Sequence, residues 1–559
     1  MRSSFTLPSL TSETLCLLHK CTLKKDLTEG RALHATLIHH GLDSIPFWAD
    51  HLIRLFTSCQ SLVESNRVFS RVSQPSIYTW NAIISAHAKL GHPEHVFSLY
   101  ETMTMNSIME KMKRECGVMD KMKNINRECC TGPDRVTLLS LLKCCGLNAS
   151  RRRYVHHHVV LHGLESDVVL ASALVDINAK CGSLRDALKL FKGLHPKDVV
   201  SWAVLMTGYI QHEFHLMALN LFEDMKIEGV KPDRVIYLCI VKACGHTQIL
   251  ELGRLIHAEI IKDGLEEDLT IVNTLIDMYA KCGSLGEAFK MLHKFSKRDA
   301  VSWSALLSGY VQHGYDAVVF ESFCKMKEEG IKPSKVTYLC VLKGCINLLA
   351  IVQGWYIHDQ IIQDGFQSDL EIGNSLVDLY AKCGMPDEGN RVFIWLPKKD
   401  IVSWGALVAG YAQVGKFNIV LHFLNDMDKK GFKPNDVIFT SIFAACSRAG
   451  STQEAQKYFH VMVEQFSIKP NIQHYSCLID LFGRSGLLKE AEQFFEIMPL
   501  PPDGIPWKSL LTSCKTHGSI NLGQMCFDRG VELDPEDATN YELLSGLYAD
   551  ANVHKLKLA

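Results

Sequence analysis

The 559-residue sequence contains no apolar run of 18 or more residues, so it predicts no membrane-spanning helix. It also has almost no net charge, because 59 lysines and arginines nearly balance 61 aspartates and glutamates. This balance excludes the broad basic surface of a non-specific nucleic-acid binder, although it leaves room for a local basic track. The first residues, MRSSFTLPSL, lack the apolar core of a secretory leader.

Missing motifs restrict the chemistry further. A zinc deaminase needs H-x-E and P-C-x-x-C, but the chain has no C-x-x-C and matches H-x-E only by chance at His92-Pro93-Glu94. No phosphate-binding loop, G-x-S-x-G or H-E-x-x-H is present. We therefore predict that the chain is not an enzyme, needs no cofactor and holds no metal. Three histidines that recur in register are interpreted as core or helix-face residues: His156, His257 and His358.

The cysteines and the first residues bear on the compartment. Twenty cysteines without a secretory leader favour a reducing compartment, with thiols buried between helices. Two sets recur in register: Cys145, Cys244 and Cys345, and Cys181, Cys282 and Cys383. Residues 1–10 contain Arg2 and four serines and threonines but no acid. This composition predicts a short transit segment directing the chain to the mitochondrion, with the chloroplast as the alternative.

An internal repeat organises the sequence. Trp202, Trp303 and Trp404 are 101 residues apart, and DVVSW returns as DAVSW and DIVSW. Each 101-residue period divides into three predicted helical pairs of 35, 35 and 31 residues. In the unit 269–299, for example, a helix ends at Cys282, Gly283 supplies a left-handed C′ residue, and Ser284 with Glu287 predicts a capping box. Stacked pairs of this kind predict an all-α solenoid.

Extending the register gives fourteen units over residues 11–503, followed by residues 504–559. The register requires an insertion near 104–128, which we expect to extend a helix or to loop out, and a gap of two residues near Ser150. The predicted units are 11–45, 46–76, 77–134, 135–167, 168–198, 199–233, 234–268, 269–299, 300–334, 335–369, 370–400, 401–435, 436–471 and 472–503.

With VVSW-A-x-L, DMYAKCG and G-x-K-P-D in units of mixed length, the sequence resembles the pentatricopeptide repeat family, in particular its plant subclass of P, L and S units. The resemblance implies a right-handed α-solenoid superhelix that binds single-stranded organellar RNA. Residues 504–559 resemble the tetratricopeptide-like E-type extension of RNA-editing members, cut short at Ala559.

The resemblance also assigns roles to residues. It gives base reading to the fifth and last residues of a unit, here Asn81/Asp134, Ser172/Asp198, Asn273/Asp299, Ser304/Ser334, Asn374/Asp400, Thr440/Asn471 and Ser476/Asp503. Base sandwiching falls to the second residue of P units: Tyr78, Val200, Val301 and Val402. A basic track for the phosphates is predicted at the thirteenth position of the units: Lys89, Lys180, Lys281, Lys382 and Arg484. The family code then predicts the target U-n-G-n-n-U-A-n-U-n-A-G, read 5′ to 3′ from residue 77.

These features leave several hypotheses for the function. The leading one is a site-recognition factor for C-to-U RNA editing that acts with a deaminase in trans. A second keeps RNA binding without editing, in RNA stabilisation, splicing or translation. A third is a protein-binding scaffold of tetratricopeptide type, which the recurring asparagine, serine and aspartate pairs argue against. A fourth is a degraded or mispredicted gene product, for which the insertion, the gap and the abrupt C-terminus are the grounds.

Overall fold

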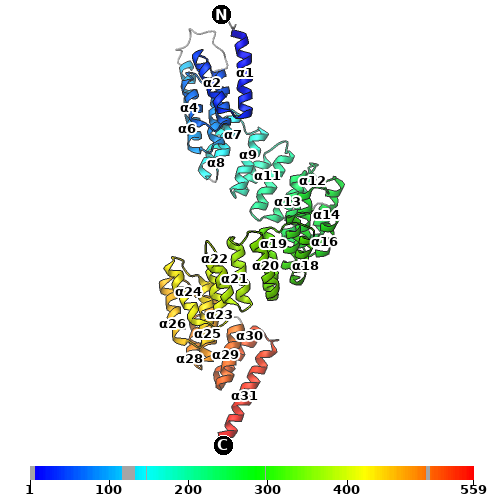
Figure 1. Cartoon of the computed structure of the whole chain (residues 1–559), viewed down its shortest axis with the longest axis vertical. Helices are drawn as coiled ribbons and strands as arrows, with labels where there is room; N and C mark the ends of the chain where they lie inside the picture. The colour runs from blue at the N-terminus through cyan, green and yellow to red at the C-terminus, as the bar shows by residue number, and fades with distance from the viewer. Residues whose placement is uncertain (1–6, 116–131, 147, 296–297, 499–503, 559) are drawn as a thin grey trace. The chain divides into compact units, whose positions relative to one another are not determined.

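In the computed structural model, the described residues are 7–115, 132–146, 148–295, 298–498 and 504–558. Over these residues the chain forms α-helices, one π-helical segment and no strand (Figure 1), which confirms the predicted all-α class. The transit segment predicted over 1–10 lies largely outside the described residues, as does the predicted base-reading residue Asp503. None of the described helices is both long and apolar enough to cross a membrane.

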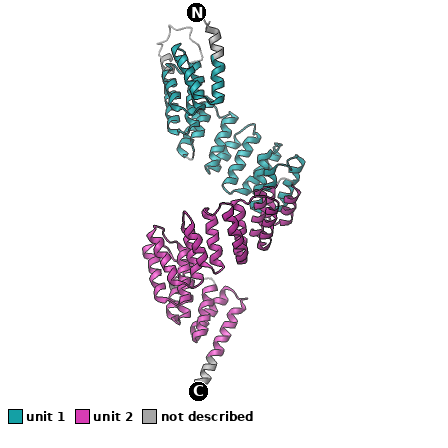
Figure 2. Cartoon of the chain, in the orientation of Figure 1, with its two compact units in different colours: residues 1–274 teal, residues 275–559 magenta. Residues whose placement is uncertain are grey.

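Two compact units divide the chain, residues 1–274 and residues 275–559 (Figure 2). The helices of the first unit are α1 (Leu7–Lys24), α2 (Leu27–His39), α3 (Pro46–Ser58), α4 (Leu62–Arg71), α5 (Ile77–Lys89), α6 (Pro93–Glu115), α7 (Arg135–Cys144), α8 (Ala149–Leu161), α9 (Val168–Lys180), α10 (Leu184–Lys192), α11 (Val199–Gln211), α12 (His215–Ile227), α13 (Arg234–Thr247) and α14 (Leu250–Lys262). The boundary between the units falls within α15 (Leu269–Lys281).

The second unit continues with α16 (Leu285–Lys294), α17 (Ala300–Gln312), α18 (Asp316–Glu328), α19 (Lys335–Leu348), α20 (Ile351–Gln363), α21 (Leu370–Lys382), α22 (Pro386–Trp395), α23 (Ile401–Gln413), α24 (Phe417–Lys429), α25 (Asp436–Ala449), α26 (Thr452–His460), the π-helical segment Val461–Gln465, α27 (Ile472–Arg484), α28 (Leu488–Ile497), α29 (Gly504–His517), α30 (Ile520–Leu533) and α31 (Ala538–Leu558). Within each unit the helices form antiparallel pairs, and the first helix of a pair packs against the first helix of the next, as α9 does on α11 and α21 on α23.

Local signals in the sequence set the helix ends. Asp400 precedes α23 and its side chain accepts a hydrogen bond from the Ser403 N–H, which makes it the N-cap. Gly283 adopts a φ of 77°, the left-handed conformation predicted for the turn between α15 and α16. The capping box predicted at Ser284 is wrong, because the Ser284 hydroxyl donates to the Glu287 carboxylate and caps no backbone N–H.

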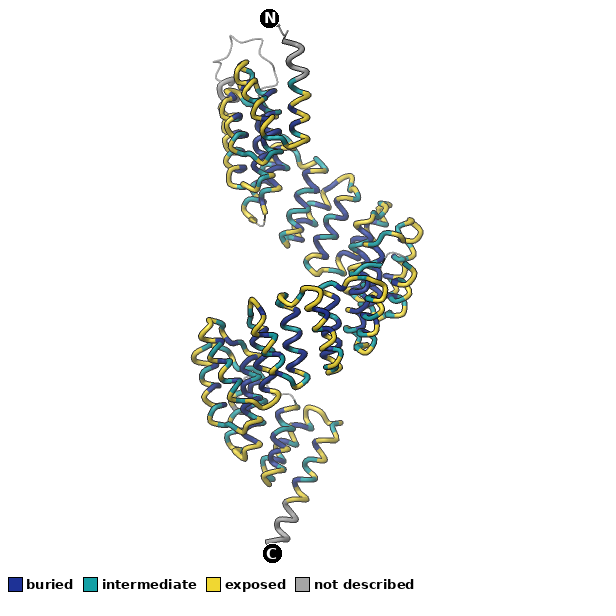
Figure 3. Tube along the Cα trace, in the orientation of Figure 1, coloured by how far each residue is buried: buried dark blue, intermediate teal, exposed yellow. Residues whose placement is uncertain are grey.

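The core follows the first helices of the pairs (Figure 3). The repeated tryptophans Trp202, Trp303 and Trp404 are almost fully buried, and Trp404 meets the Phe393 ring edge-on at 4.7 Å. Glycines let the first helices approach closely, since a Cβ built on Gly410 would lie 2.6 Å from that of Ala381. Each pair therefore buries its apolar face mainly against its neighbours, as a solenoid requires.

The predicted cysteine packing is correct for one set only. Cys145, Cys244 and Cys345 are buried within the first helices of their pairs. The other set is partly exposed, because Cys181, Cys282 and Cys383 follow the last residue of a helix rather than facing the core. Cys181, for example, donates through its Sγ to the carbonyl oxygen of Gly146.

The predicted insertion begins as a helical extension. The α6 helix has 23 residues, whereas the second helices α8 and α12 each have 13. Residues 104–115 of the insertion lie in this extension, and its remainder lies outside the described residues. His92 lies in the turn before α6, and Pro93 and Glu94 form the start of that helix.

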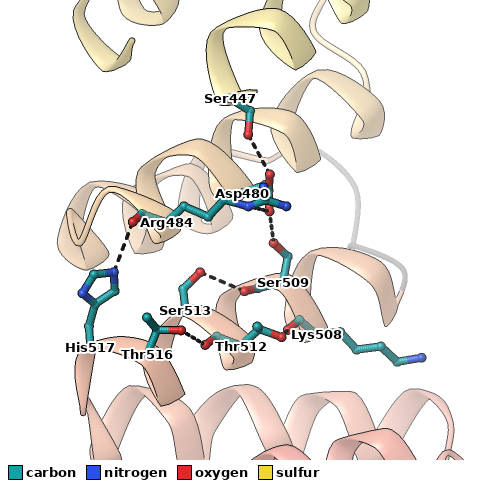
Figure 4. Close-up of polar contacts among 9 residues, drawn as sticks. All are labelled: Ser447, Asp480, Arg484, Lys508, Ser509, Thr512, Ser513, Thr516 and His517. Carbon is teal, nitrogen blue, oxygen red and sulfur yellow. Dashed lines mark hydrogen bonds and ion pairs between the residues drawn. The ribbon is translucent and has the colours of Figure 1, made fainter. Parts of the chain in front are cut away.

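Residues 504–558 add three further helices to the stack. Figure 4 shows the contact between α27 and α29, which centres on the Asp480 carboxylate. One of its oxygens accepts from the Ser509 hydroxyl at 2.8 Å and from the Arg484 guanidinium at 2.9 Å, and the other accepts from the Ser447 hydroxyl. The His517 ring lies 3.2 Å from the carbonyl oxygen of Arg484. The segment after the predicted repeats thus packs on α27 much as one repeat packs on the next.

Candidate nucleic-acid interface

Exposed apolar side chains recur at the second position of the predicted units. The predicted sandwiching residues Tyr78, Val200, Val301 and Val402 are 58–63% exposed at the starts of α5, α11, α17 and α23. Sequence reasoning missed further members of this stripe, although the same periodicity could have found them: Phe47, Val136, Val169, Val235, Val336 and Val437, all exposed. Apolar side chains held in water at regular intervals are suited to flat apolar ligands such as nucleic-acid bases.

A predicted base-reading pair lies beside the stripe where α5 meets α7. The Asn81 amide nitrogen donates to both carboxylate oxygens of Asp134, at 3.0 and 2.9 Å. The Thr137 hydroxyl donates to the Asn81 side-chain oxygen at 2.5 Å and lies 2.9 Å from an Asp134 oxygen. These contacts fix the orientation of the Asn81 amide before any ligand arrives.

The same three-residue arrangement recurs between α21 and α23. The Asn374 amide donates to Asp400 at 3.2 Å, and the Ser403 hydroxyl donates to the Asn374 side-chain oxygen at 2.6 Å. Burial raises the pKa of Asp400, but hydrogen bonds from Ser403 and Asn374 outweigh it and hold this pKa below its usual value. Asp400 is therefore a carboxylate at neutral pH and acts as an acceptor.

A hydroxyl version of the network lies between α17 and α19. The Ser304 hydroxyl is 3.3 Å from that of Ser334 and 2.8 Å from that of Thr337. In all three networks the last residue of one predicted unit is the N-cap of the next first helix. Sequence reasoning missed the third member, Thr137, Thr337 or Ser403, although its N3 position in the capped helix is a visible signal.

The remaining predicted readers are arranged differently. Ser172 is buried, and its hydroxyl has no hydrogen-bond partner among the described residues, while Asp198 caps α11. Asn273 lies in α15, and Asp299 is the N-cap of α17. The Thr440 hydroxyl donates to the carbonyl oxygen of Asp436, whereas Asn471 caps α27 together with His474. The Ser476 hydroxyl donates to Ile472 within its own helix.

The predicted phosphate track consists largely of ion-paired residues. Lys180, Lys281, Lys382 and Arg484 each contact the aspartate four residues earlier on the same helix, at 2.7–2.9 Å: Asp176, Asp277, Asp378 and Asp480. Lys89 is exposed near the end of α5. Exposed pairs of this kind contribute only about 0–1 kcal/mol to folding. They nevertheless lower the positive charge available to a polyanion.

Removing the paired aspartates provides a test of this track. In the triple variant Asp176→Asn, Asp277→Asn and Asp378→Asn, three lysines lose their carboxylate partners. If the lysines face the RNA backbone, we expect the slope of log affinity against log salt to steepen by about 2, from about 0.7 per phosphate contact. The measurement is RNA-binding anisotropy over a salt series. An unchanged slope would show that these lysines do not contact phosphates.

Comparisons with known proteins agree with this repeat architecture. The PPR repeat family model matches residues 197–246, 298–347 and 399–448, and PPR repeat models match further segments, including 78–108, 270–299 and 466–499. A pentatricopeptide repeat-containing protein of Arabidopsis thaliana is 30% identical over 96% of this chain and 70% of its own length. The chain therefore belongs to the pentatricopeptide repeat family.

Other relatives differ in length and in the compartment their names give. A chloroplastic Arabidopsis thaliana member is 29% identical over 96% of this chain, and a mitochondrial one is 29% identical over 95%. The chain spans 64% of the chloroplastic relative and 57% of another, so it covers less than two thirds of these relatives' lengths.

Among solved structures, the fold is similar to that of the maize pentatricopeptide repeat protein PPR10. The TM-score is 0.62 and the identity 17%, over 98% of this chain and 94% of PPR10. PPR10 in complex with an 18-nucleotide psaJ RNA element gives a TM-score of 0.61 at 15% identity, over 96% of this chain and 92% of that one. This likeness establishes the α-solenoid fold.

Proposed function

We propose that this protein binds single-stranded RNA in a sequence-specific manner and marks a cytidine for C-to-U editing by a deaminase acting in trans. The observation that carries the RNA-binding step is the recurrence of an exposed apolar second residue beside a fixed polar pair. An apolar side chain can hold a base by its face, while the pair presents donors and acceptors to its edge. The complex of PPR10 with an RNA element supports the same ligand class.

Sequence specificity rests on the polar pairs. A pair with fixed amide and carboxylate atoms, such as Asn374 and Asp400, accepts only bases whose edges complement it. Wrong bases leave a buried polar group unpaired, at a cost of about 1–3 kcal/mol. Seven predicted readers along the chain would then suffice to select a rare site.

The editing step and the compartment are supported by resemblance. Residues 504–559 resemble the E-type extension, and α29 packs on α27 through Ser509 and Asp480, which would keep the extension at a fixed distance from the repeats. The chain carries no C-x-x-C, so the deaminase would be a separate protein. We place the protein in the mitochondrion, with the chloroplast as the alternative. The units in this reading are those of the P, L and S subclass.

The test is fluorescence anisotropy with a labelled RNA carrying U-n-G-n-n-U-A-n-U-n-A-G. The comparison RNA exchanges U with A and G with C at the read positions, with equal length and label. We expect tenfold or tighter binding to the first RNA. Equal affinity for both would overturn the assignment of the reading pairs, and no binding to either would overturn RNA binding itself.

A further inference from the structure

A basic pocket opens between α8, α9 and α10 of the first unit, on residues that take no part in the predicted RNA contacts. Its volume is about 470 Å³, within the usual range for small-molecule sites. Arg152, Arg153, His156 and Lys189 line it together with Asn178, Ser183, Asp186, Ala149 and Leu190. Four side chains that carry or can carry positive charge thus face one exposed carboxylate, that of Asp186.

Arg152 is the unusual member, because it is only 9% exposed. Its guanidinium makes long hydrogen bonds of 3.3 Å to two neutral groups, the Asn178 side-chain oxygen and the Ser183 hydroxyl. Its Nε has no partner, and no carboxylate among the described residues lies within ion-pairing distance. A buried charge without a counter-charge is costly, so this arrangement calls for an anion.

The internal repeat shows that the pocket is a local departure. With the two-residue gap near Ser150, position 152 corresponds to Gly30, Gly253 and Gly354 in the other units of its type. A Cβ built on Gly354 would lie only 2.6 Å from the Leu379 side chain, so this position normally has no room for a side chain. Here an arginine stands in its place.

The residue opposite has changed as well. Position 178 corresponds to Phe56, Tyr279, Tyr380 and Phe482, which are nearly or fully buried aromatic residues. At Tyr380 the hydroxyl contacts His358 Nδ1 at 2.8 Å, but Asn178 is too short to do the same for His156, the counterpart of His358. The glycine–aromatic pair has thus become an arginine–asparagine pair, which exchanges a packed ring for a charged pocket.

We propose that this pocket binds the phosphate group of a small molecule of mononucleotide size. A phosphate dianion would supply the counter-charge that Arg152 lacks and accept hydrogen bonds from Arg153 and Lys189. The first residue of α8 and the N-cap of α10, Ala149 and Ser183, also line the pocket, and helix N-termini favour anions. Free phosphate and a nucleoside monophosphate share this chemistry, and the volume exceeds what phosphate alone fills.

The test is isothermal titration calorimetry of the full chain with inorganic phosphate, UMP and uridine at constant ionic strength. We expect one equivalent of phosphate or UMP to bind with a Kd of about 1 mM or below, with UMP tighter and uridine without saturable binding. If phosphate and UMP bind equally, the ligand is free phosphate. No saturable phosphate binding would overturn the proposal.

The double variant Arg152→Gly, Asn178→Tyr restores the residues of the neighbouring units and is expected to fold as they do. We expect it to lose phosphate affinity by tenfold or more, and Arg153→Ala with Lys189→Ala to lose several-fold. The matched control removes the equivalent charges one repeat later, Arg254→Ala with Lys290→Ala, and should bind as the parent does. Unchanged phosphate binding in the Arg152→Gly, Asn178→Tyr variant would overturn the site.

RNA anisotropy separates this proposal from the proposed function. The Arg152→Gly, Asn178→Tyr variant should bind the predicted target RNA as tightly as the parent, because the pocket lies on other residues than the stripe and the pairs. An equal loss of RNA affinity would show that the pocket holds RNA phosphates and would overturn its assignment to a small ligand. Failure of RNA binding in the parent chain would leave the calorimetric result unaffected.

Discussion

Changing Asn374 to threonine and Asp400 to asparagine is expected to reverse the base preference at the ninth nucleotide of the target from uracil to adenine. The present pair has an amide held between a carboxylate and the Ser403 hydroxyl. The new pair has the composition of Thr440/Asn471, for which the family code gives adenine. At about 1–3 kcal/mol per good contact, each preference should be roughly tenfold or more.

This variant should fold, because asparagine already caps α25 and α27 at the corresponding places, and asparagine and aspartate cap helices about equally well. The measurement is anisotropy on four RNAs that differ only at nucleotide nine. A matched control is Asn435→Asp, which makes a similar change at the N-cap of α25, opposite Gly405, where no side chain is available to read a base. A preference for uracil that survives the double change would contradict base reading by this pair.

Replacing Val200, Val301 and Val402 by serine should weaken binding to every RNA by about a hundredfold. The three side chains are 58–60% exposed, so their apolar surface is free to be covered by bases. Covering one valine contributes about 1 kcal/mol, and the three sites are far enough apart for their effects to add. Because a base face carries no sequence information, the target and the exchanged RNA should lose affinity in equal proportion.

A control with the same chemistry is available on the second helices. Val63, Leu216 and Val352 occupy the second position of α4, α12 and α20 and are 61–67% exposed. Their replacement by serine removes a similar apolar area, and we expect no change in RNA affinity. Equal losses in both triple variants would show that the first-helix stripe has no special role.

The sequence predicted the helical pairs well because the repeat itself marks their ends. The glycine after α15 and the aspartate before α23 are local signals whose effect does not depend on distant residues. The i, i+4 pairing of Lys180 with Asp176 was also visible in the sequence, and considering it would have reduced the charge assigned to the track.

Other features depend on contacts that one unit does not reveal. Thr137 belongs to the repeat after that of Asn81, so their hydrogen bond emerges only when the helices are stacked. The charged pocket required knowing that Arg152 and Asn178 face each other across two helices. The exposed half of the cysteine pattern, at Cys181, depends on where the helix ends rather than on residue type.

The three-residue networks have a consequence for how errors in folding would show themselves. Asn81 and Asp134 are joined to Thr137 of the following repeat, so one letter of the recognised sequence is held at a junction between two repeats. If α5 and α7 separated while the rest of the stack remained intact, the protein would still bind RNA but would tolerate any base at that one letter. A local loss of stacking would therefore resemble a change in the recognised word, a single wildcard, and not a loss of affinity.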